Sequence, residues 1–197
     1  MSKQLIVDYL PFDINKTQIN ESMKDNNGRL VVKGVLQRAE SENQNGRIYP
    51  REILMREADK YTGNFIEQNR ALGELDHPDS SVVNLNNASH NITEMHWDGD
   101  DLMGTVEVLS TPSGNILKEL FKSGIKLGIS SRGLGSVKEN TGDDTVEVQD
   151  DFELIAFDFV SNPSTHGAFL YPMNESKQHK ITPENKIERI ITDILGG

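Results

Sequence analysis

The sequence predicts an α+β fold built around a β-barrel or a folded sheet. Most of the chain divides into short apolar or alternating runs separated by Gly, Pro, Asn and Asp, which is typical of strands and turns. Two segments in the body of the chain have helical periodicity, and a third amphipathic segment stands near the C-terminus. Mostly strands with two interspersed helices indicate the α+β class.

The first forty residues are predicted to form two strands joined by a loop. Residues 3–10 (KQLIVDYL) and 30–39 (LVVKGVLQRA) are rich in apolar and β-branched side chains, which favour strands. Residues 11–29 are polar and rich in Asn, Lys and Asp, so we expect a loop there. A turn at Asn45-Gly46 follows the second strand.

A helix is predicted over about 51–68. Pro50 suits the first turn of a helix, where its missing N–H costs nothing. Apolar side chains then recur at helical spacing and indicate a face packed on a core: Leu54, Ala58, Tyr61 and Phe65. The next segment, ALGELDHP (71–78), begins as a short strand and ends at His77-Pro78.

A hairpin and a second helix are predicted in the middle of the chain. Residues 90–97 and 101–109 form the two arms of the hairpin, with Asp98-Gly99-Asp100 at its turn. Thr111-Pro112 supplies a cap and a first turn for the helix that follows, and Gly124 suits the position just past its end.

The last third contains further strands and a separable tail. Strands are expected at 125–131, 133–138, 145–149, 152–160 and HGAFLYP (166–172), and 152–160 (FELIAFDFV) is the most apolar run. We divide the chain into a domain of residues 1–172 and a tail of residues 173–197. The tail contains a polar linker and an amphipathic helix with apolar residues at i, i+3, i+4, i+7 and i+8.

Composition limits the classes of function. The 197 residues are enough for one domain with a sizeable core. The net charge of −11 argues against general binding to nucleic acid or to a membrane surface. No run approaches the ~20 apolar residues of a membrane span, and the N-terminus does not resemble a signal peptide, so we expect a cytoplasmic protein. The absence of cysteine excludes thiolate nucleophiles, cysteine-ligated zinc and iron–sulfur clusters.

Three segments could carry chemistry. His77 ends a short strand before a polar loop, although a turn histidine is the simpler interpretation. The stretch GISSRGLGS (128–136) places glycines around two adjacent serines after an apolar strand, as an oxyanion hole beside a nucleophile requires; a glycine-rich strand and turn explains it equally well. Asp158 is an acid in an apolar strand, where it either faces solvent or has a partner such as histidine.

No metal site and no cofactor are predicted. His90 and His96 lie six residues apart in an expected strand, on the same face in principle, but no HExxH motif or supporting second shell accompanies them. An exposed or packed histidine is therefore the preferred interpretation for both.

Taken together, six segments resemble, in order and spacing, the prohead core proteases of T4-like tailed bacteriophages. The segments are GRIYP (46–50), the helix after it, ALGELDHP, the hairpin with Trp97, GISSRGLGS and DFVSNPS (158–164), and the similarity covers roughly 30–172. That family is related to the herpesvirus assemblin-type serine proteases. The resemblance therefore implies a herpesvirus-protease-like closed β-barrel core with surrounding helices, and a serine endopeptidase activity.

The resemblance also implies a catalytic set. The family histidine corresponds to His77 and the nucleophile to Ser130, with Ser131 as an alternative. The third member corresponds to Asp158, with His166 as an alternative. Serine needs an adjacent base, and the base needs an orienting partner, so these residue types suit the chemistry.

Two residues beyond the serines have possible supporting roles. Arg132 and Gly133 are candidates for oxyanion stabilisation or for strand geometry. A structural ion pair between Arg132 and an acidic residue is the alternative.

The resemblance implies cleavage after Glu with an apolar residue two positions before it. This chain contains that pattern, and we expect self-processing at Glu21 and at Glu175, a looser match, because both lie in predicted polar loops. The implied substrates are scaffold or core proteins and the major capsid protein, inside the prohead in the host cytoplasm, with self-association of the enzyme. A non-catalytic capsid or tail assembly protein on the same fold is the alternative function.

Overall fold

The structure is a computed structural model. It describes residues 3–12, 14–76, 78, 80–140, 142 and 145–161. Several features predicted from the sequence lie outside the described residues: His77, His166, Glu175, the strand at 166–172, and the linker and helix of 173–197.

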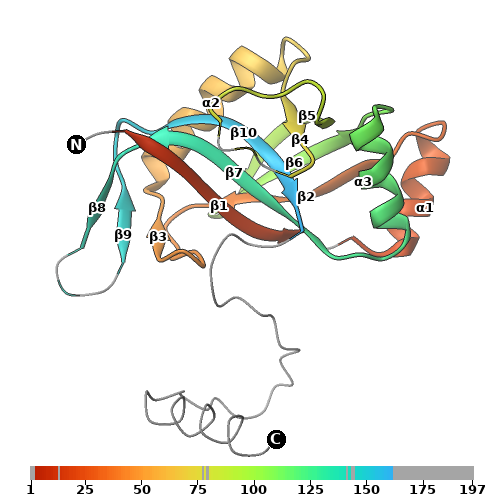
Figure 1. The fold of residues 1–197 in the computed structure, drawn as a ribbon. Helices are drawn as coiled ribbons and strands as arrows, with labels where there is room; N and C mark the ends of the chain where they lie inside the picture. The colour runs from red at the N-terminus through yellow and green to blue at the C-terminus, as the bar shows by residue number, and fades with distance from the viewer. Residues whose placement is uncertain are drawn as a thin grey trace, which may run out of the picture. The chain divides into compact units, whose positions relative to one another are not determined.

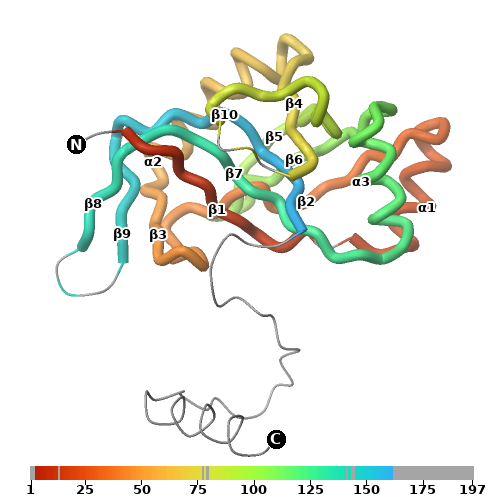
Figure 2. Tube along the Cα trace, in the orientation of Figure 1, coloured from red at the N-terminus to blue at the C-terminus, as the bar shows by residue number. Residues whose placement is uncertain are grey.

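Ten strands of the described chain form three sheets. The first is antiparallel, with β7 (Leu127–Gly135) between β1 (Gln4–Phe12) and β10 (Glu153–Val160); Figures 1 and 2 show these three strands side by side. The second has the order β2 (Val31–Arg38), β6 (Asp101–Val108), β5 (Ala88–Asp98) and β4 (Leu72–Glu74). The third has the order β3 (Arg47–Ile48), β9 (Val146–Val148) and β8 (Val137–Glu139).

The α+β mixture is as predicted, but the closed barrel is wrong for the described residues, because all three sheets are open. Among the described residues one isolated bridge joins β10 to the end of β4, from Phe159 to Leu75, the residue after β4. At this seam, side chains form hydrogen bonds with backbone groups that a β-ladder between β10 and β4 would use. The Glu74 N–H donates to the Asp158 carboxylate (3.0 Å), and the Phe157 carbonyl accepts from His90 (2.9 Å).

Helix α1 (Lys16–Asp25) replaces the loop predicted for residues 11–29. It begins with a capping box in which Asn15 and Gln18 bond each other's backbone N–H (2.9 Å each). Its one fully buried residue is Ile19, so its apolar face is too narrow to give a clear periodic signal. Glu21 therefore lies on a helix and not in a loop.

The other two helices confirm the sequence prediction. Helix α2 (Arg51–Tyr61) follows Pro50 and continues into the π-helical turn η1 (Thr62–Ile66). Helix α3 (Pro112–Lys122) is capped by Thr111, whose hydroxyl accepts from the backbone of Gly114. Gly124 has φ +77° just past its end, as predicted.

Strand β7 is one continuous strand of nine residues, whereas two strands, 125–131 and 133–138, were expected. Arg132 is the residue that lies between the two predicted strands. The structure buries that residue completely between two carboxylates, so the strand continues through it. The predicted hairpin is confirmed as β5 and β6, and the most apolar run is confirmed as the largely buried β10.

Aromatic packing joins the sheets to α3. The ring of Phe159 makes edge contacts with Phe12 of β1 and Phe121 of α3, at centroid distances of 5.1 and 5.3 Å. This cluster fixes β10, and therefore Asp158, within the core. Among the described residues no helix is both long and apolar enough to cross a bilayer.

Candidate active site

The two adjacent serines of β7 point to opposite faces of the first sheet. Side chains alternate along a strand, so Ser130 and Arg132 share one face while Ser131 faces the other way. Both serines are buried, at 1% and 2% exposure. The sequence left open which serine has the environment of a nucleophile, and the two faces differ sharply in their partners.

Ser130 lies directly opposite Asp158 of β10 and Tyr9 of β1. Residues that stand opposite each other in an antiparallel pair have Cβ atoms about 4.5–5.5 Å apart on the same face. The hydroxyl of Ser130 has no hydrogen-bond partner within the described part of the chain. A buried hydroxyl left unbonded is costly, and such groups often mark functional positions.

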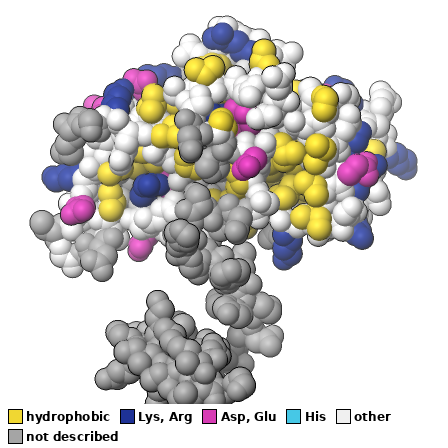
Figure 3. All heavy atoms as spheres, viewed as in Figure 1, with side chains coloured by type: hydrophobic (Ala, Val, Ile, Leu, Met, Phe, Trp, Pro, Cys, Tyr) yellow, Lys and Arg dark blue, Asp and Glu magenta, His cyan; other side chains and the backbone are white. Residues whose placement is uncertain are grey.

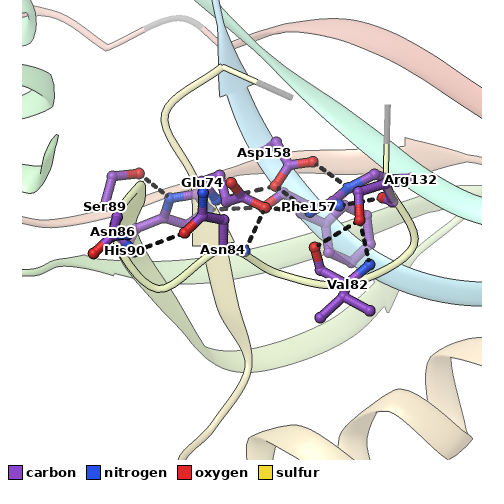
Figure 4. A network of polar contacts seen from close by, with 10 residues as sticks. Glu74, Val82, Asn84, Asn86, Ser89, His90, Arg132, Phe157 and Asp158 are labelled. Atoms are coloured by element: carbon purple, nitrogen blue, oxygen red, sulfur yellow. Dashed lines mark hydrogen bonds and ion pairs between the residues drawn. The ribbon is translucent and has the colours of Figure 1, made fainter. Parts of the chain in front are cut away.

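Arg132, Asp158 and Glu74 form a fully buried ion network on the face of Ser130 (Figure 4). The Arg132 Nε donates to Asp158 Oδ2 at 2.8 Å, and its Nη2 donates to Asp158 Oδ1 at 3.2 Å and to Glu74 Oε1 at 3.0 Å. All three side chains are 0% exposed. The alternative role of Arg132, a structural ion pair with acidic residues, is therefore confirmed.

The Asp158 carboxylate already accepts hydrogen bonds from more than one group. Besides the two bonds from Arg132, its Oδ1 accepts from the Glu74 backbone N–H at 3.0 Å. Burial raises the pKa of Asp158 above its usual value, with Arg132 acting in the opposite direction. Of the two options that the sequence offered for this acid, solvent exposure and a partner, the structure supports a partner, and that partner is an arginine.

Leu75 and Asp76, which precede position 77, lie along β10. The Asp76 N–H donates to the Phe159 carbonyl at 2.8 Å, and Leu75 forms its bridge to the same residue. Farther along, Arg132 Nη1 donates to the Ser80 carbonyl at 2.6 Å. The described residues on both sides of His77 are thus held beside Asp158 and Arg132.

Ser131 belongs to a separate polar cluster built from the GRIYP segment. Its Oγ accepts from Gln37 Nε2 at 2.7 Å, and it lies within hydrogen-bond reach of the Tyr49 hydroxyl. Tyr49 in turn donates to the buried Asp8 carboxylate, which also accepts from Arg47 at 2.7 Å. Burial, followed by the charge of Asp8, raises the pKa of Tyr49 well above its usual value. Ser131 is therefore committed to structural bonds.

The glycines beside the serines are required by packing. A Cβ on Gly128 would lie 1.5 Å from the ring of Tyr9, and one on Gly133 would lie 2.3 Å from the ring of Phe152. Gly133 also stands in the ladder between β1 and β10. Strand geometry therefore accounts for the glycine at this position.

His90 is a buried, neutral histidine at the edge of the network. Its Nε2 donates to the Phe157 carbonyl at 2.9 Å, so Nδ1 is left to accept from the Ser89 hydroxyl at 2.8 Å. Burial lowers the pKa of His90 to about 4. His96 is exposed on the same strand. Within the described residues no three metal-ligating side chains gather.

Glu74 was not among the site residues predicted from the sequence, although it lies inside the ELDHP block on which the resemblance rests. Glu74 Oε1 accepts from the Asn84 N–H and from Arg132, both at 3.0 Å, whereas Oε2 is buried with no partner among the described residues. Only an acid inside an otherwise buried short strand could have indicated it, and three residues of strand are too few for such a signal.

Comparison with known proteins points in one direction. A family model described as prohead core protein serine protease matches residues 4–178 of this chain. The prohead core protein protease of Enterobacteria phage T4 is 34% identical over 146 residues, which are 73% of this chain and 68% of that relative. The solved structure of the bacteriophage T4 capsid assembly protease is similar with a TM-score of 0.70 and 26% identity, covering 82% of this chain and 99% of that one.

Proposed function

Because the chain belongs to the prohead core protein serine protease family, and so is a protease of phage capsid assembly, we propose that it is an endopeptidase whose nucleophile is Ser130. His77 acts as the general base and Asp158 belongs to the supporting charge network. The observation that carries the proposal is the buried hydroxyl of Ser130, which has no hydrogen-bond partner among the described residues and lies on the same face as Asp158 and Arg132.

The chemistry is acyl transfer in two halves. The base takes the proton of Ser130 as Oγ bonds to the scissile carbonyl carbon, and the same proton then passes to the leaving amine as the C–N bond breaks. The base then takes a proton from water as the water oxygen bonds to the acyl carbon, and it gives that proton to Ser130 Oγ as the ester C–O bond breaks. The oxyanion role of Arg132 remains part of the proposal, but Nε, Nη1 and Nη2 of its guanidinium already donate to Asp158, the Ser80 carbonyl and Glu74, so one of these bonds must be exchanged for the oxyanion. Gly133 supports the strand geometry. Because Ser130 is 1% exposed, surrounding side chains move before a substrate reaches it.

The relatives are named a prohead core protein protease and a capsid assembly protease, which supports substrates among prohead proteins; the further details come from the resemblance. We expect the enzyme to cleave scaffold or core proteins and the major capsid protein inside the prohead, in the host cytoplasm, after Glu with an apolar residue two positions before it. Self-association is also expected. The surface beside α3 is apolar (Figure 3), and its Ile116 and Ile125 are 54% and 49% exposed, as an interface between copies requires.

Self-processing at Glu21 and Glu175 remains part of the proposal. At the first site the apolar residue is Ile19, which is 1% exposed in α1, so cleavage there requires local unfolding of the helix. Mass spectrometry of protein recovered from mature particles is expected to show new termini at Ser22 or Ser176. Intact peptides across both bonds would refute self-processing.

The test of the nucleophile uses the two serines as a matched pair. The Ser130→Ala chain is expected to lose scaffold cleavage by at least ~10³-fold, because no other hydroxyl is proposed to attack the scissile carbonyl. The Ser131→Ala chain loses one hydroxyl from the same strand and is expected to retain cleavage. His77→Gln is expected to behave like Ser130→Ala. Full activity of Ser130→Ala would refute the assignment.

A further inference from the structure

The two most exposed large apolar side chains of the described chain lie on one loop. Val82 is 70% exposed and Leu85 is 71% exposed, whereas the other exposed large apolar residues that the structure describes range from 38% to 54%. Both stand in the segment of residues 80–87, between β4 and β5. A single exposed apolar residue is ordinary, but two of them so close together give this loop an apolar surface that another molecule can contact.

The same loop is bonded to the ion network on the face of Ser130 (Figure 4). The Ser80 carbonyl accepts from Arg132 Nη1 at 2.6 Å, and farther along the loop the Asn84 N–H donates to Glu74 Oε1 at 3.0 Å. Arg132 follows Ser130 by two residues on β7, so the two side chains share one face of the strand. The two apolar residues therefore belong to a loop that is anchored at the candidate active site.

Polar groups of the loop hold its backbone in defined turns. The Val82 N–H donates to the Ser80 hydroxyl at 3.1 Å. The Asn87 N–H donates to the Asn84 carbonyl at 2.9 Å, which places Leu85 at the second position of a β-turn. Serine and asparagine favour such turns, but the turns require no apolar residue at either position. Because both apolar side chains are mostly exposed, they also contribute little to the stability of the fold.

We propose that Val82 and Leu85 bind an apolar side chain of the substrate and so determine part of the specificity of the protease. The proposal rests on the function proposed above, because it places the scissile bond at Ser130. Two residues of strand, from Ser130 to Arg132, span about 7 Å, and Val82 lies within about 7 Å of Ser80 along the chain. An extended peptide advances about 3.3 Å per residue, so a substrate that lies along this face past Arg132 meets the loop within a few residues of the scissile bond.

A contact away from the reacting atoms is made equally in the ground state and in the transition state, so its loss raises KM and leaves kcat unchanged. The double variant Val82→Thr/Leu85→Asn keeps the approximate size and shape of both side chains and removes their apolar character. With the scaffold protein as substrate, we expect its KM to rise by about 5- to 20-fold and its kcat to stay within about twofold. Leu85→Met, which stays apolar, is expected to retain the KM of the wild type. Met55→Gln, at an apolar residue of α2 that is 38% exposed, is the matched control and is expected to change neither constant.

The decisive test pairs the loop variant with changes in the substrate. A scaffold bond that the wild type cleaves is located by mass spectrometry, and each apolar residue within about four positions of it is replaced by alanine in turn. With the wild type, one such replacement is expected to lower kcat/KM by about 5- to 20-fold. With Val82→Thr/Leu85→Asn the same replacement is expected to cost less than about twofold, because its partner on the loop is already lost. Equal losses with both enzymes would overturn the proposal.

Sedimentation velocity of the wild type and the double variant tests a second copy of the chain as the other occupant of the loop. A smaller assembly in the variant, with the substrate losses equal in both enzymes, would assign the loop to an interface between copies and overturn the proposal. Retained cleavage by Ser130→Ala would refute the proposed nucleophile. Loss of cleavage in Ser130→Ala together with equal substrate losses would overturn the loop proposal alone, so the two failures are distinguishable.

Discussion

Acid sensitivity of the fold is predicted from one buried histidine. The ring of His90 is fully buried, and the Phe157 carbonyl and the Ser89 hydroxyl together fix it in one neutral tautomer. The folded protein therefore resists protonation at this ring, whereas the unfolded chain binds a proton there with an ordinary pKa of about 6.5. The perturbation we choose is His90→Gln, which keeps an amide donor and cannot titrate.

The magnitude follows from linkage. The folded pKa of about 4 lies below the unfolded value of about 6.5, so between these values the unfolded state binds more protons. The free energy of unfolding then falls as the pH falls, by up to about 1.4 kcal/mol per pH unit. Between about pH 7 and about pH 4.5 the loss from this one group is about 2 kcal/mol, a large share of a typical domain stability of about 5–15 kcal/mol.

Urea unfolding followed by the fluorescence of Trp97, the one tryptophan of the chain, measures this loss at several pH values. Other acids titrate in the same range, so the decisive quantity is the difference between the wild type and His90→Gln. The wild type is expected to lose about 2 kcal/mol more than the variant. His96→Gln, which replaces an exposed histidine of β5, is the matched control and is expected to follow the wild type. Parallel losses in the wild type and His90→Gln would refute the reasoning.

Two further predictions concern packing and the cluster behind Ser131. Gly128→Ala forces a methyl group into the ring of Tyr9 and is expected to destabilise the fold by about 1–3 kcal/mol, whereas Gly63→Ala, with open space around it, is expected to be neutral or slightly stabilising in thermal unfolding. Tyr49→Phe removes a donor from the buried Asp8 carboxylate and is expected to cost about 1–3 kcal/mol in urea unfolding; an unchanged midpoint would contradict the importance of that bond.

Much of the secondary structure could be predicted from local pattern. The hairpin of β5 and β6, helices α2 and α3 and the apolar β10 all follow from periodicity, capping residues and turn residues, which act over a few neighbouring positions. Helix α1 could not be predicted in this way. Its stability depends on one buried side chain, Ile19, and on a cap that a polar composition concealed.

The sheet arrangement depended on contacts between distant segments. At the seam of β10 and β4, Asp158 and His90 bond backbone groups that a ladder would need, and β1 and β2, the other edges of these two sheets, do not pair among the described residues. A local sequence pattern cannot predict that a side chain of one strand will form the hydrogen bond that a backbone carbonyl or N–H of a distant strand would otherwise form.

The sequence by itself determined the classes of residue available for catalysis. It contains no cysteine, it places two serines among glycines, and it resembles a family of serine proteases through GISSRGLGS and ELDHP. Only the tertiary structure decided how these residues are grouped. The pleat of the strand places Ser130 and Ser131 on opposite faces, and the pairing of β7 with β10 brings Asp158 beside Ser130. Arg132 is buried away from water, so its guanidinium forms ion pairs within the protein, with Asp158 and Glu74.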